Sequence, residues 1–456
     1  MTRRDRGRRA SGLPLAPTAS LILTRSSANQ PPLSCPVKQL PRNGRSERPI
    51  HSHCTTDPSC RSDKELLRLA DQCVKCGLCL PLCPTYAQTR NEADSPRGRI
   101  SLVQGWVNGD LAMTPRLAGH LDGCLTCRAC ETGCPSLVAF GQIMDGAKTR
   151  RVASQSRWRR ALDQSWIAAL SNPRLNAALG RFAKSYAHSP LARLARWLRL
   201  DRHPRLSPFF RLTGAIAVNA RTRVPAARES TDIDLFVGCS GETAQGGAIA
   251  AAMEVFERLG IRANLPDTAS CCGAMLRHNG FPDAARSHRN ALVETGSNRP
   301  LVGLSSACVA ELRESPELAD AWEICDYLDR QPWPEALQLR PLRARVLVHE
   351  PCSHRNLLGG NASVHHLLER IPELDLAPMP ENHRCCGAAG TYLLQQPEMS
   401  AALLANKLDP ALSASPDIIV TTNSGCALHL LAGVQEAGRS VEVIHPMELL
   451  ARQMPS

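Results

Sequence analysis

Two short cysteine runs constrain this chain more than any other feature of its sequence. The first run, CVKCGLCLPLCP, and the second, CLTCRACETGCP, share the pattern C-x2-C-x2-C-x3-C-P. Three thiolates two residues apart can wrap one corner-rich cluster, while the fourth, one residue further on and followed by proline, points toward another cluster. The spacing therefore predicts two 4Fe–4S clusters with crossed ligands: Cys73, Cys76, Cys79 and Cys134 for cluster 1, and Cys124, Cys127, Cys130 and Cys83 for cluster 2.

Structural zinc is the alternative for such runs. Zinc needs only two CxxC pairs, which would leave thiolates without a role in each run. The N-terminus lacks the long apolar stretch of a secretory signal, so we expect a cytoplasmic protein. A reducing cytoplasm disfavours a disulfide framework for the 20 cysteines, and iron–sulfur clusters remain the favoured interpretation.

Composition and hydrophobic spacing divide residues 1–231 into three predicted segments. Residues 1–62, rich in Arg, Ser and Pro, are predicted to be a disordered basic extension, and residues 63–148 to be a helical dicluster ferredoxin-like domain. Residues 149–231 read as a basic helical connector, with Trp and Leu at helical spacing among arginines. Helices that bury one apolar stripe on a neighbouring domain are favoured there over a membrane-surface helix.

Helix-start signals support the dicluster assignment. Ser62 is a plausible cap for a helix before the first run, and Pro96 and Pro115 stand at the first positions of two helices between the runs. The first of these helices opens with DSPRGR. Its Arg97 and Arg99 either lie near cluster sulfurs and raise the reduction potential, or are solvated charges at a helix start.

From residue 232 onward, strand and helix patterns alternate, and the whole pattern occurs twice. DIDLFVGC and ARVLVHEPC are short apolar strands that lead to a cysteine, RPLVGLSSAC and PDIIVTTNSGC are two more, and corresponding cysteines lie 113 to 118 residues apart. We predict two repeated α/β domains with parallel sheets, at residues 232–340 and 341–456. The fold class is thus a helical dicluster domain followed by two α/β Cys-Cys-Gly domains.

Each repeat carries a lone cysteine, a Cys-Cys-Gly and a further cysteine near a strand end. Ligand-binding sites in open α/β sheets usually lie at the ends of strands. The thiols at these positions therefore predict a metal or cluster site or a redox dithiol. Four buried structural cysteines per repeat are the alternative, which the recurrence in register disfavours. The cysteines of this additional site are Cys239, Cys271, Cys272 and Cys308 in the first repeat, and Cys352, Cys385, Cys386 and Cys426 in the second.

These features together resemble the heterodisulfide reductase-related family of iron–sulfur subunits. Within that family, DSPRGRI, HLDGCLTCRACETGCPS, CCGAAGTYLLQQPEMS and TNSGCALHL are similar to the iron–sulfur subunits of bacterial glycolate oxidases, from about residue 63 to the end. The resemblance implies an electron-transfer subunit whose flavin-binding partner oxidises glycolate to glyoxylate. It also implies delivery of the electrons toward a membrane quinone, with the chain cytoplasmic or peripheral at the inner membrane.

The sequence departs from the family pattern at one point. Heterodisulfide reductases close each Cys-Cys-Gly domain with CxxC, whereas Ser305 and Asn423 replace the first cysteine of that pair here. This departure leaves a four-thiolate site, or none, as alternatives to a five-thiolate cluster. Three nearby histidines, His349, His354 and His429, are expected to be structural rather than ligands.

Several functions remain open. No nucleotide-binding glycine motif and no nucleophile–base pair is evident, so we predict no catalytic residue in this chain and assign substrate oxidation to the flavoprotein partner. A matching subunit for lactate or glycerol-3-phosphate dehydrogenation, or a thiol–disulfide redox protein, is the alternative. Basic blocks with 11 Lys/Arg against 3 Asp/Glu (residues 1–61) and 17 against 3 (residues 150–230) also suit a nucleic-acid-binding sensor, but nucleic acid is not the expected partner.

Overall fold

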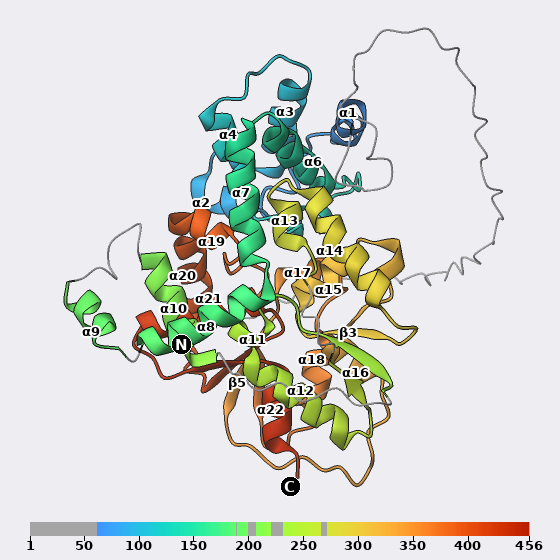
Figure 1. Ribbon diagram of the computed structural model, residues 1–456, viewed down its shortest axis with the longest axis vertical. Coiled ribbons are helices and arrows are strands. Elements are labelled where there is room, and N and C mark those ends of the chain that lie inside the picture. Colours follow the sequence, from blue (N-terminus) through green and yellow to red (C-terminus); the bar gives the residue numbers. More distant parts are fainter. Residues whose placement is uncertain (1–61, 188, 199–206, 220–230, 266–270, 456) are drawn as a thin grey trace, which may run out of the picture. The chain divides into compact units, whose positions relative to one another are not determined.

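The computed structural model of the chain describes residues 62–187, 189–198, 207–219, 231–265 and 271–455 (Figure 1). The predicted disordered extension lies outside these residues, apart from Ser62 at its end. None of the described helices combines the length and the apolar character needed to span a bilayer.

The dicluster region is helical, as predicted. Ser62 accepts a hydrogen bond from the backbone N–H of Glu65 and so caps the first helix, while Ser95 and Thr114 cap the helices that begin with Pro96 and Pro115. The helices are α1 (Asp63–Asp71), α2 (Pro84–Thr89), the 3₁₀ turn η1 (Glu92–Asp94), α3 (Pro96–Val107), α4 (Pro115–Asp122), α5 (Ala129–Thr132) and α6 (Phe140–Ala153).

The connector is helical too, but its apolar residues are divided between the interior and the surface. On the first connector helix Ile167 is buried in a cluster with Leu276 and Phe281 of the first Cys-Cys-Gly domain. Trp158 and Trp197, by contrast, are 77% and 78% exposed, so a single buried stripe describes this region incompletely. The helices are α7 (Arg157–Leu170), α8 (Pro173–Ala187), α9 (Pro190–Trp197) and α10 (Ser207–Asn219).

The first Cys-Cys-Gly domain holds a four-stranded parallel sheet in the order β2-β1-β3-β4. All four residues of its first strand are buried, as the apolar pattern predicts for a strand covered on both faces. The strands are β1 (Ile233–Phe236), β2 (Ala263–Asn264), β3 (Leu301–Gly303) and β4 (Trp322–Glu323). The helices are α11 (Gly241–Ala244), α12 (Gly246–Arg258), α13 (Ala274–His278), α14 (Pro282–Thr295), α15 (Ser306–Leu312), the 3₁₀ turn η3 (Pro316–Leu318) and α16 (Ile324–Asp329).

The second Cys-Cys-Gly domain repeats this topology, with a parallel sheet in the order β6-β5-β7-β8. The prediction of two α/β units with parallel sheets is therefore confirmed. The strands are β5 (Arg345–His349), β6 (Asp375–Pro378), β7 (Ile418–Thr421) and β8 (Glu442–Ile444). The helices are α17 (Cys352–Leu357), α18 (Ala362–Leu368), α19 (Tyr392–Gln395), α20 (Pro397–Ser413), α21 (Ser424–Glu436) and α22 (Pro446–Gln453).

The two sheets share one buried core. A single apolar cluster includes Ile233 and Val302 from the first sheet, and Val346 and Val420 from the second. Helix α12 of the first domain packs against α22 of the second, which carries Leu450 into the same cluster (Figure 1). Burial of this common apolar surface stabilises the pair of domains together.

Candidate metal centres

Cys83 of the first run meets three cysteines of the second run at one cavity. Cys83, Cys124, Cys127 and Cys130 all line this space, which we call the second-run cavity. Cys83 is the residue before Pro84, where α2 begins. The structure thus brings together the four residues predicted for cluster 2.

Burial raises the pKa of two of these thiols, Cys127 and Cys130. The nearby sulfurs of Cys127, Cys124 and Cys83 raise the pKa of Cys130 further because a second negative charge would be repelled. The four groups are thus close enough to interact electrostatically. A shared cation would offset that repulsion and allow all four thiols to bind as thiolates.

The first run is more open. Cys76 is exposed, and Cys73, Cys79 and Cys134 are partly buried against the apolar cluster that contains Cys124 and Cys130. Burial raises the pKa of Cys79, and the charges of Cys73 and Cys83 raise it further. The sulfur of Cys134 accepts a hydrogen bond from the Val138 N–H at 3.5 Å.

Both runs use the same backbone turn. Lys75 and Gly77 in the first run, and Thr126 and Arg128 in the second, have left-handed φ values of 57°, 87°, 50° and 57°. These residues occupy the same places between the first three cysteines of each run. Left-handed residues reverse the backbone locally, so side chains two positions apart can converge. The conformation costs energy for a residue with a side chain, and Arg128 is held by ion pairs with Glu131 and Glu314.

Arg99 is a buried charge on the wall of the second-run cavity. Its side chain is 1% exposed, Nη1 donates to Thr85 Oγ1 at 3.0 Å, and Nε donates to the His120 carbonyl at 2.7 Å. Nη2 lies 3.6 Å from an oxygen of Asp94 and makes no hydrogen bond to the described residues. A buried guanidinium with a spare donor fits an anionic group in the cavity.

Arg97 lies near the first run instead. Its guanidinium pairs with Glu92 at 2.6 Å and donates to the carbonyl of Lys75 at 3.1 Å. Pro96 does stand at the first position of α3, so the helix-start interpretation of DSPRGR also holds. The motif therefore starts a helix and places one arginine beside each cysteine run.

The cysteines of the first repeat also converge. The thiols of Cys239, Cys271, Cys272 and Cys308 lie close enough that Cys271 interacts with Cys239 and Cys272, and Cys272 with Cys308, and these interactions shift their pKa values. The interactions with Cys239 and Cys272 lower the pKa of the Cys271 thiol because they stabilise its thiolate. We call these four residues the first Cys-Cys-Gly set.

The second repeat shows the same arrangement. Cys352, Cys385, Cys386 and Cys426, the second Cys-Cys-Gly set, are linked in the same order, and the Cys386 thiol donates to Cys426 Sγ at 3.0 Å. Hydrogen bonds from Cys352 and Cys386 lower the pKa of Cys385. The structure therefore brings each predicted set of four thiols together.

Steric constraints explain why each cysteine pair is followed by glycine. Gly273 and Gly387 have φ values of 88° and 87°, which favour glycine. A Cβ atom on Gly273 would lie 2.9 Å from the Ala285 carbonyl oxygen, and one on Gly387 would lie 2.7 Å from that of Ser400. Helices α14 and α20 thus approach the backbone of Gly273 and Gly387 closely, which leaves no room for a side chain there.

Sequence reasoning missed two residues at the second set. A ring nitrogen of His349 lies within 4.8 Å of the sulfurs of Cys386 and Cys426, although this histidine was expected to be structural. Lys407 is fully buried, and its ammonium donates to three backbone carbonyls, the nearest being that of Arg384 at 2.8 Å. No signal in the sequence marks Lys407, which reaches the site from the middle of α20.

The other two histidines have different surroundings. His354 lies with Glu323 and Asp326, and His429 bonds the hydroxyl of Ser400 at 3.1 Å. The replacements in the closing motif have structural roles as well. The side-chain oxygen of Asn423 caps α21 by accepting from the N–H groups of Gly425 and Cys426, and the hydroxyl of Ser305 accepts from the Ser424 N–H at 3.4 Å.

The second Cys-Cys-Gly set lies against the second cysteine run. Leu125, Cys385 and Tyr392 form a buried cluster, with Cys127 and Cys352 packed at its edge. Burial raises the pKa of Cys127, and the next largest cause is the neighbouring Cys385 sulfur. Because thiols from the two domains lie in one buried cluster, groups bound at the two sites would be close neighbours.

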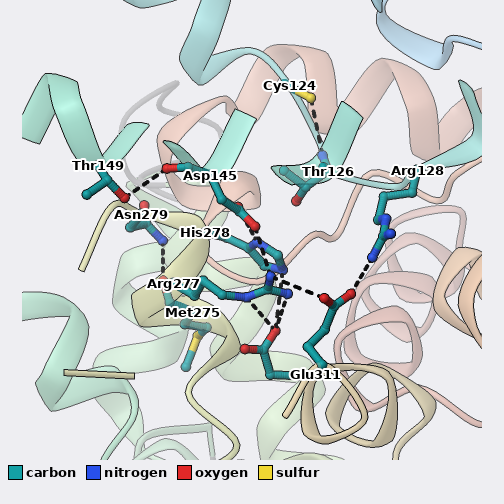
Figure 2. A network of polar contacts seen from close by, with 12 residues as sticks. Cys124, Thr126, Arg128, Asp145, Thr149, Met275, Arg277, His278, Asn279 and Glu311 are labelled. Carbon is teal, nitrogen blue, oxygen red and sulfur yellow. Dashed lines mark hydrogen bonds and ion pairs between the residues drawn. The ribbon is translucent and has the colours of Figure 1, made fainter. Parts of the chain in front are cut away.

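A buried ion network joins the first Cys-Cys-Gly domain to the dicluster region (Figure 2). Arg277 donates to Asp145 of α6 at 3.0 Å and to Glu311 of α15 at 2.6 Å, and His278 bonds Asp145 at 3.0 Å. Burial alone would raise the pKa of Asp145, but the charges of Arg277 and His278 outweigh it and lower that pKa to about 2. The first Cys-Cys-Gly domain is thus joined to the dicluster region by salt bridges, whereas the second is joined to it where thiols pack together.

Family models match the same regions. Residues 69–138 match the 4Fe-4S dicluster domain, and residues 233–313 and 346–431 each match the Cysteine-rich domain. These matches cover both cysteine runs and all eight cysteines of the two Cys-Cys-Gly sets.

Two relatives that align with most of this chain are iron–sulfur subunits by name. The chain is 30% identical over 404 residues to the glycolate oxidase iron-sulfur subunit of Escherichia coli (strain K12), covering 84% of this chain and 93% of that protein. It is 26% identical over 413 residues to the probable glycolate oxidase iron-sulfur subunit of Bacillus subtilis (strain 168), covering 83% and 92%. Lactate utilization protein A of Exiguobacterium sp. is 24% identical over 241 residues, covering 48% of this chain and 96% of that protein. With its dicluster region followed by two cysteine-rich domains, the chain belongs to the family of glycolate oxidase iron–sulfur subunits.

Proposed function

We propose that this chain is the electron-transfer subunit of a glycolate oxidase complex. A flavin-binding partner oxidises glycolate to glyoxylate, and this chain passes the electrons toward a membrane acceptor such as a quinone. The relative from Escherichia coli carries a name of this kind and aligns along 93% of its length. The observation that carries the proposal is the meeting of Cys83 with three cysteines of the second run.

The eight cysteines of the two runs are the proposed cluster ligands. Cys124, Cys127 and Cys130 would hold one 4Fe–4S cluster together with Cys83, and Cys73, Cys76 and Cys79 would hold the other together with Cys134. When bound, such clusters supply one-electron redox chemistry. The crossed pairing of the second group is supported by the cavity that its four residues line.

The chain's own residues would set the properties of these clusters. Arg99 would place a buried positive charge beside the second-run cavity, which favours the reduced, more negative form of whatever it faces. Arg97 would do the same, more weakly, at the exposed first run. Burial of Cys124 and Cys130 would exclude water from one group, whereas the exposed Cys76 leaves the other open to a partner.

A partner subunit follows from the chemistry. Glycolate releases two electrons and two protons when it is oxidised to glyoxylate, and a flavin can accept a pair of electrons and release them singly. The exposed Trp158 and Trp197, on arginine-rich helices, offer amphipathic surface for that partner or for a membrane surface. Substrate specificity would then lie in the flavoprotein.

Co-purification under anaerobic conditions tests this proposal. The chain, isolated with its flavoprotein partner, is mixed with glycolate or lactate, and cluster reduction is followed by visible absorbance and electron paramagnetic resonance (EPR). We expect glycolate to bleach the clusters and lactate to leave them oxidised. Reduction by lactate but not glycolate would contradict the proposed substrate.

A lactate-oxidising complex is the second candidate function. It is favoured by the similarity to lactate utilization protein A, which aligns along 96% of its own length but only 48% of this chain. The shorter alignment makes it the weaker candidate. The same substrate comparison separates the two functions.

A further inference from the structure

We propose that His349 is a ligand of the metal group held by the second Cys-Cys-Gly set. The group would be an iron–sulfur cluster bound by four thiolates and one imidazole. This inference rests on the proposed function, because it assumes that the chain carries iron–sulfur clusters. It makes the second set a five-donor site and separates it from the first set, which has four donors.

The position of His349 supports a ligand role. It is the last residue of β5, it is 1% exposed, and one of its ring nitrogens lies within 4.8 Å of Cys386 Sγ and Cys426 Sγ. Its Nδ1 atom is 2.8 Å from the hydroxyl of Thr421 on the neighbouring strand. Histidines that bind metals usually engage their second nitrogen in such a hydrogen bond, which fixes the ring and leaves Nε2 for the metal.

Among the described residues of the first domain, none takes the place of His349 at the end of the strand. In the second sheet His349 pairs with Thr421, and in the first sheet Phe236 pairs with Gly303 at the same place in the register. Phe236 is buried in an apolar cluster with Cys272, and Cys308 packs against that cluster. A phenyl ring offers no ligand atom, and the glycine opposite offers no hydroxyl to orient one.

The two sets also differ in the residue that the following long helix places near their sulfurs. Ser400 and Ala285 occupy equivalent places against the two Cys-Cys-Gly glycines, so Lys407, seven residues after Ser400, corresponds to Leu292. Lys407 is a buried cation near the sulfurs of the second set. Leu292 packs on the apolar cluster of the first. A buried ammonium at this position compensates thiolates of the second set, and a leucine at the same place in the first domain cannot do so.

His349 also supplies the donor that the cysteine count lacks. At the position of the missing cysteine, Asn423 uses its side-chain oxygen to cap α21 and its amide to donate to Ser353 at 3.3 Å. Both polar groups of the Asn423 side chain are therefore engaged in hydrogen bonds within the protein. The imidazole of His349, at the end of β5, would supply a fifth ligand instead.

Nitrogen hyperfine spectroscopy tests the assignment directly. The full chain is purified anaerobically with its partner, with natural or ¹⁵N-labelled histidine, and pulsed EPR is recorded after reduction. We expect a centre, distinct from the two 4Fe–4S clusters, whose strong nitrogen coupling changes with the label. His349→Phe, which installs the residue of the first domain, should abolish that coupling and raise the oxygen sensitivity of the centre or lower its iron content.

Two further variants keep the test decisive. His349→Cys retains a donor, so it should keep the iron but lose the histidine coupling. His429→Phe removes another buried histidine of the same domain and should leave the coupling intact. A label-dependent coupling that persists in His349→Phe, or a centre with no such coupling in the unmodified chain, would overturn the proposal. The two 4Fe–4S signals are recorded in the same samples, so their loss would identify a failure of the proposed function instead.

Discussion

The side-chain amide of Asn356 donates a hydrogen bond to the backbone carbonyl of Cys127 at 2.8 Å. This bond ties the second Cys-Cys-Gly domain to the second cysteine run at the point where Cys127 and Cys385 interact. The hydroxyl of Tyr392 adds a bond to the Gly123 carbonyl at 3.2 Å. The second domain, rather than the first, therefore makes the thiol-to-thiol contact with the dicluster region.

Truncating Tyr392 should weaken that contact. Tyr392→Ala removes a ring that is 5% exposed, so we expect a loss of about 3–5 kcal/mol in the free energy of unfolding and faster amide hydrogen exchange around residues 123–130. Tyr392→Phe removes only the hydroxyl and should cost about 1 kcal/mol. Equal exchange rates in both variants and the unmodified chain would show that this contact does not hold the domains together.

Cys83→Ser should damage the cluster of the second run rather than that of its own run. The reason is that Cys83 shares a cavity with Cys124, Cys127 and Cys130. EPR after reduction should show one altered and one unchanged 4Fe–4S signal, and Cys134→Ser should alter the other signal.

Cys325→Ala is the control for the cysteine variants. Cys325 is fully buried in the core shared by the two sheets and belongs to none of the four-cysteine groups. Both signals should survive its replacement. If Cys83→Ser disturbed the same signal as Cys73→Ser, the crossed assignment would be wrong.

Arg99→Met should lower the reduction potential of the second-run cluster. The substitution removes a buried positive charge from the cavity wall while keeping much of its bulk. Potentiometric EPR titration measures the effect, and Arg97→Met at the more exposed first run should give a smaller shift on the other cluster. An unchanged potential in Arg99→Met would show that this charge is already neutralised by Asp94.

Arg277→Met should destabilise the chain strongly. It would leave Asp145 and Glu311, whose side chains are 3% and 2% exposed, as buried carboxylates without their main partner. Breaking one side of a buried ion pair typically costs about 3–5 kcal/mol. Chemical denaturation measures the loss, and the exposed pair of Arg343 with Glu373 provides a control, since Arg343→Met should cost less than about 1 kcal/mol.

Glu323 should make stability fall as the pH rises. Burial raises its pKa to about 7 from an ordinary value of 4.5, so the folded chain holds a proton that the unfolded chain releases. The stabilisation is complete below pH 4.5 and is lost by the time the pH has passed about 7. Between pH 5.5 and 8 the loss is about 2 kcal/mol, taking 1.36 kcal/mol per pKa unit.

Glu323→Gln isolates this effect. The amide cannot ionise, so the variant should lose less stability than the unmodified chain over that pH interval in thermal denaturation. Parallel pH profiles for the two proteins would contradict a raised pKa at Glu323.

The strands and the helix caps follow from local sequence, and the meeting of Cys83 with the second run is predicted from the spacing of the two cysteine runs. Apolar runs such as DIDLF, caps such as Ser62, and Pro84 after Cys83 each act within a few residues of the structure they determine. The repeat in the cysteine spacing likewise predicted two similar sheets, and the register of β5 with β7 matches that of β1 with β3.

The residues that sequence reasoning missed depend on contacts between distant segments. Arg277 and Asp145 are 132 positions apart, and neither has a neighbour in sequence that signals its partner. His349 and Lys407 reach Cys386 from a strand and a helix whose packing is set by the whole second domain. A histidine next to a strand end is common, and only its distance to two sulfurs distinguishes it as a candidate ligand.

The most direct test of the central claim is the metal content of the anaerobically purified chain, read together with its EPR spectrum after reduction by glycolate and the flavoprotein. We predict brown protein with at least about eight irons per chain, two interacting 4Fe–4S signals, and reduction of both by glycolate. Colourless protein loaded with zinc, and silent in EPR, would contradict the assignment of the cysteine runs to electron transfer.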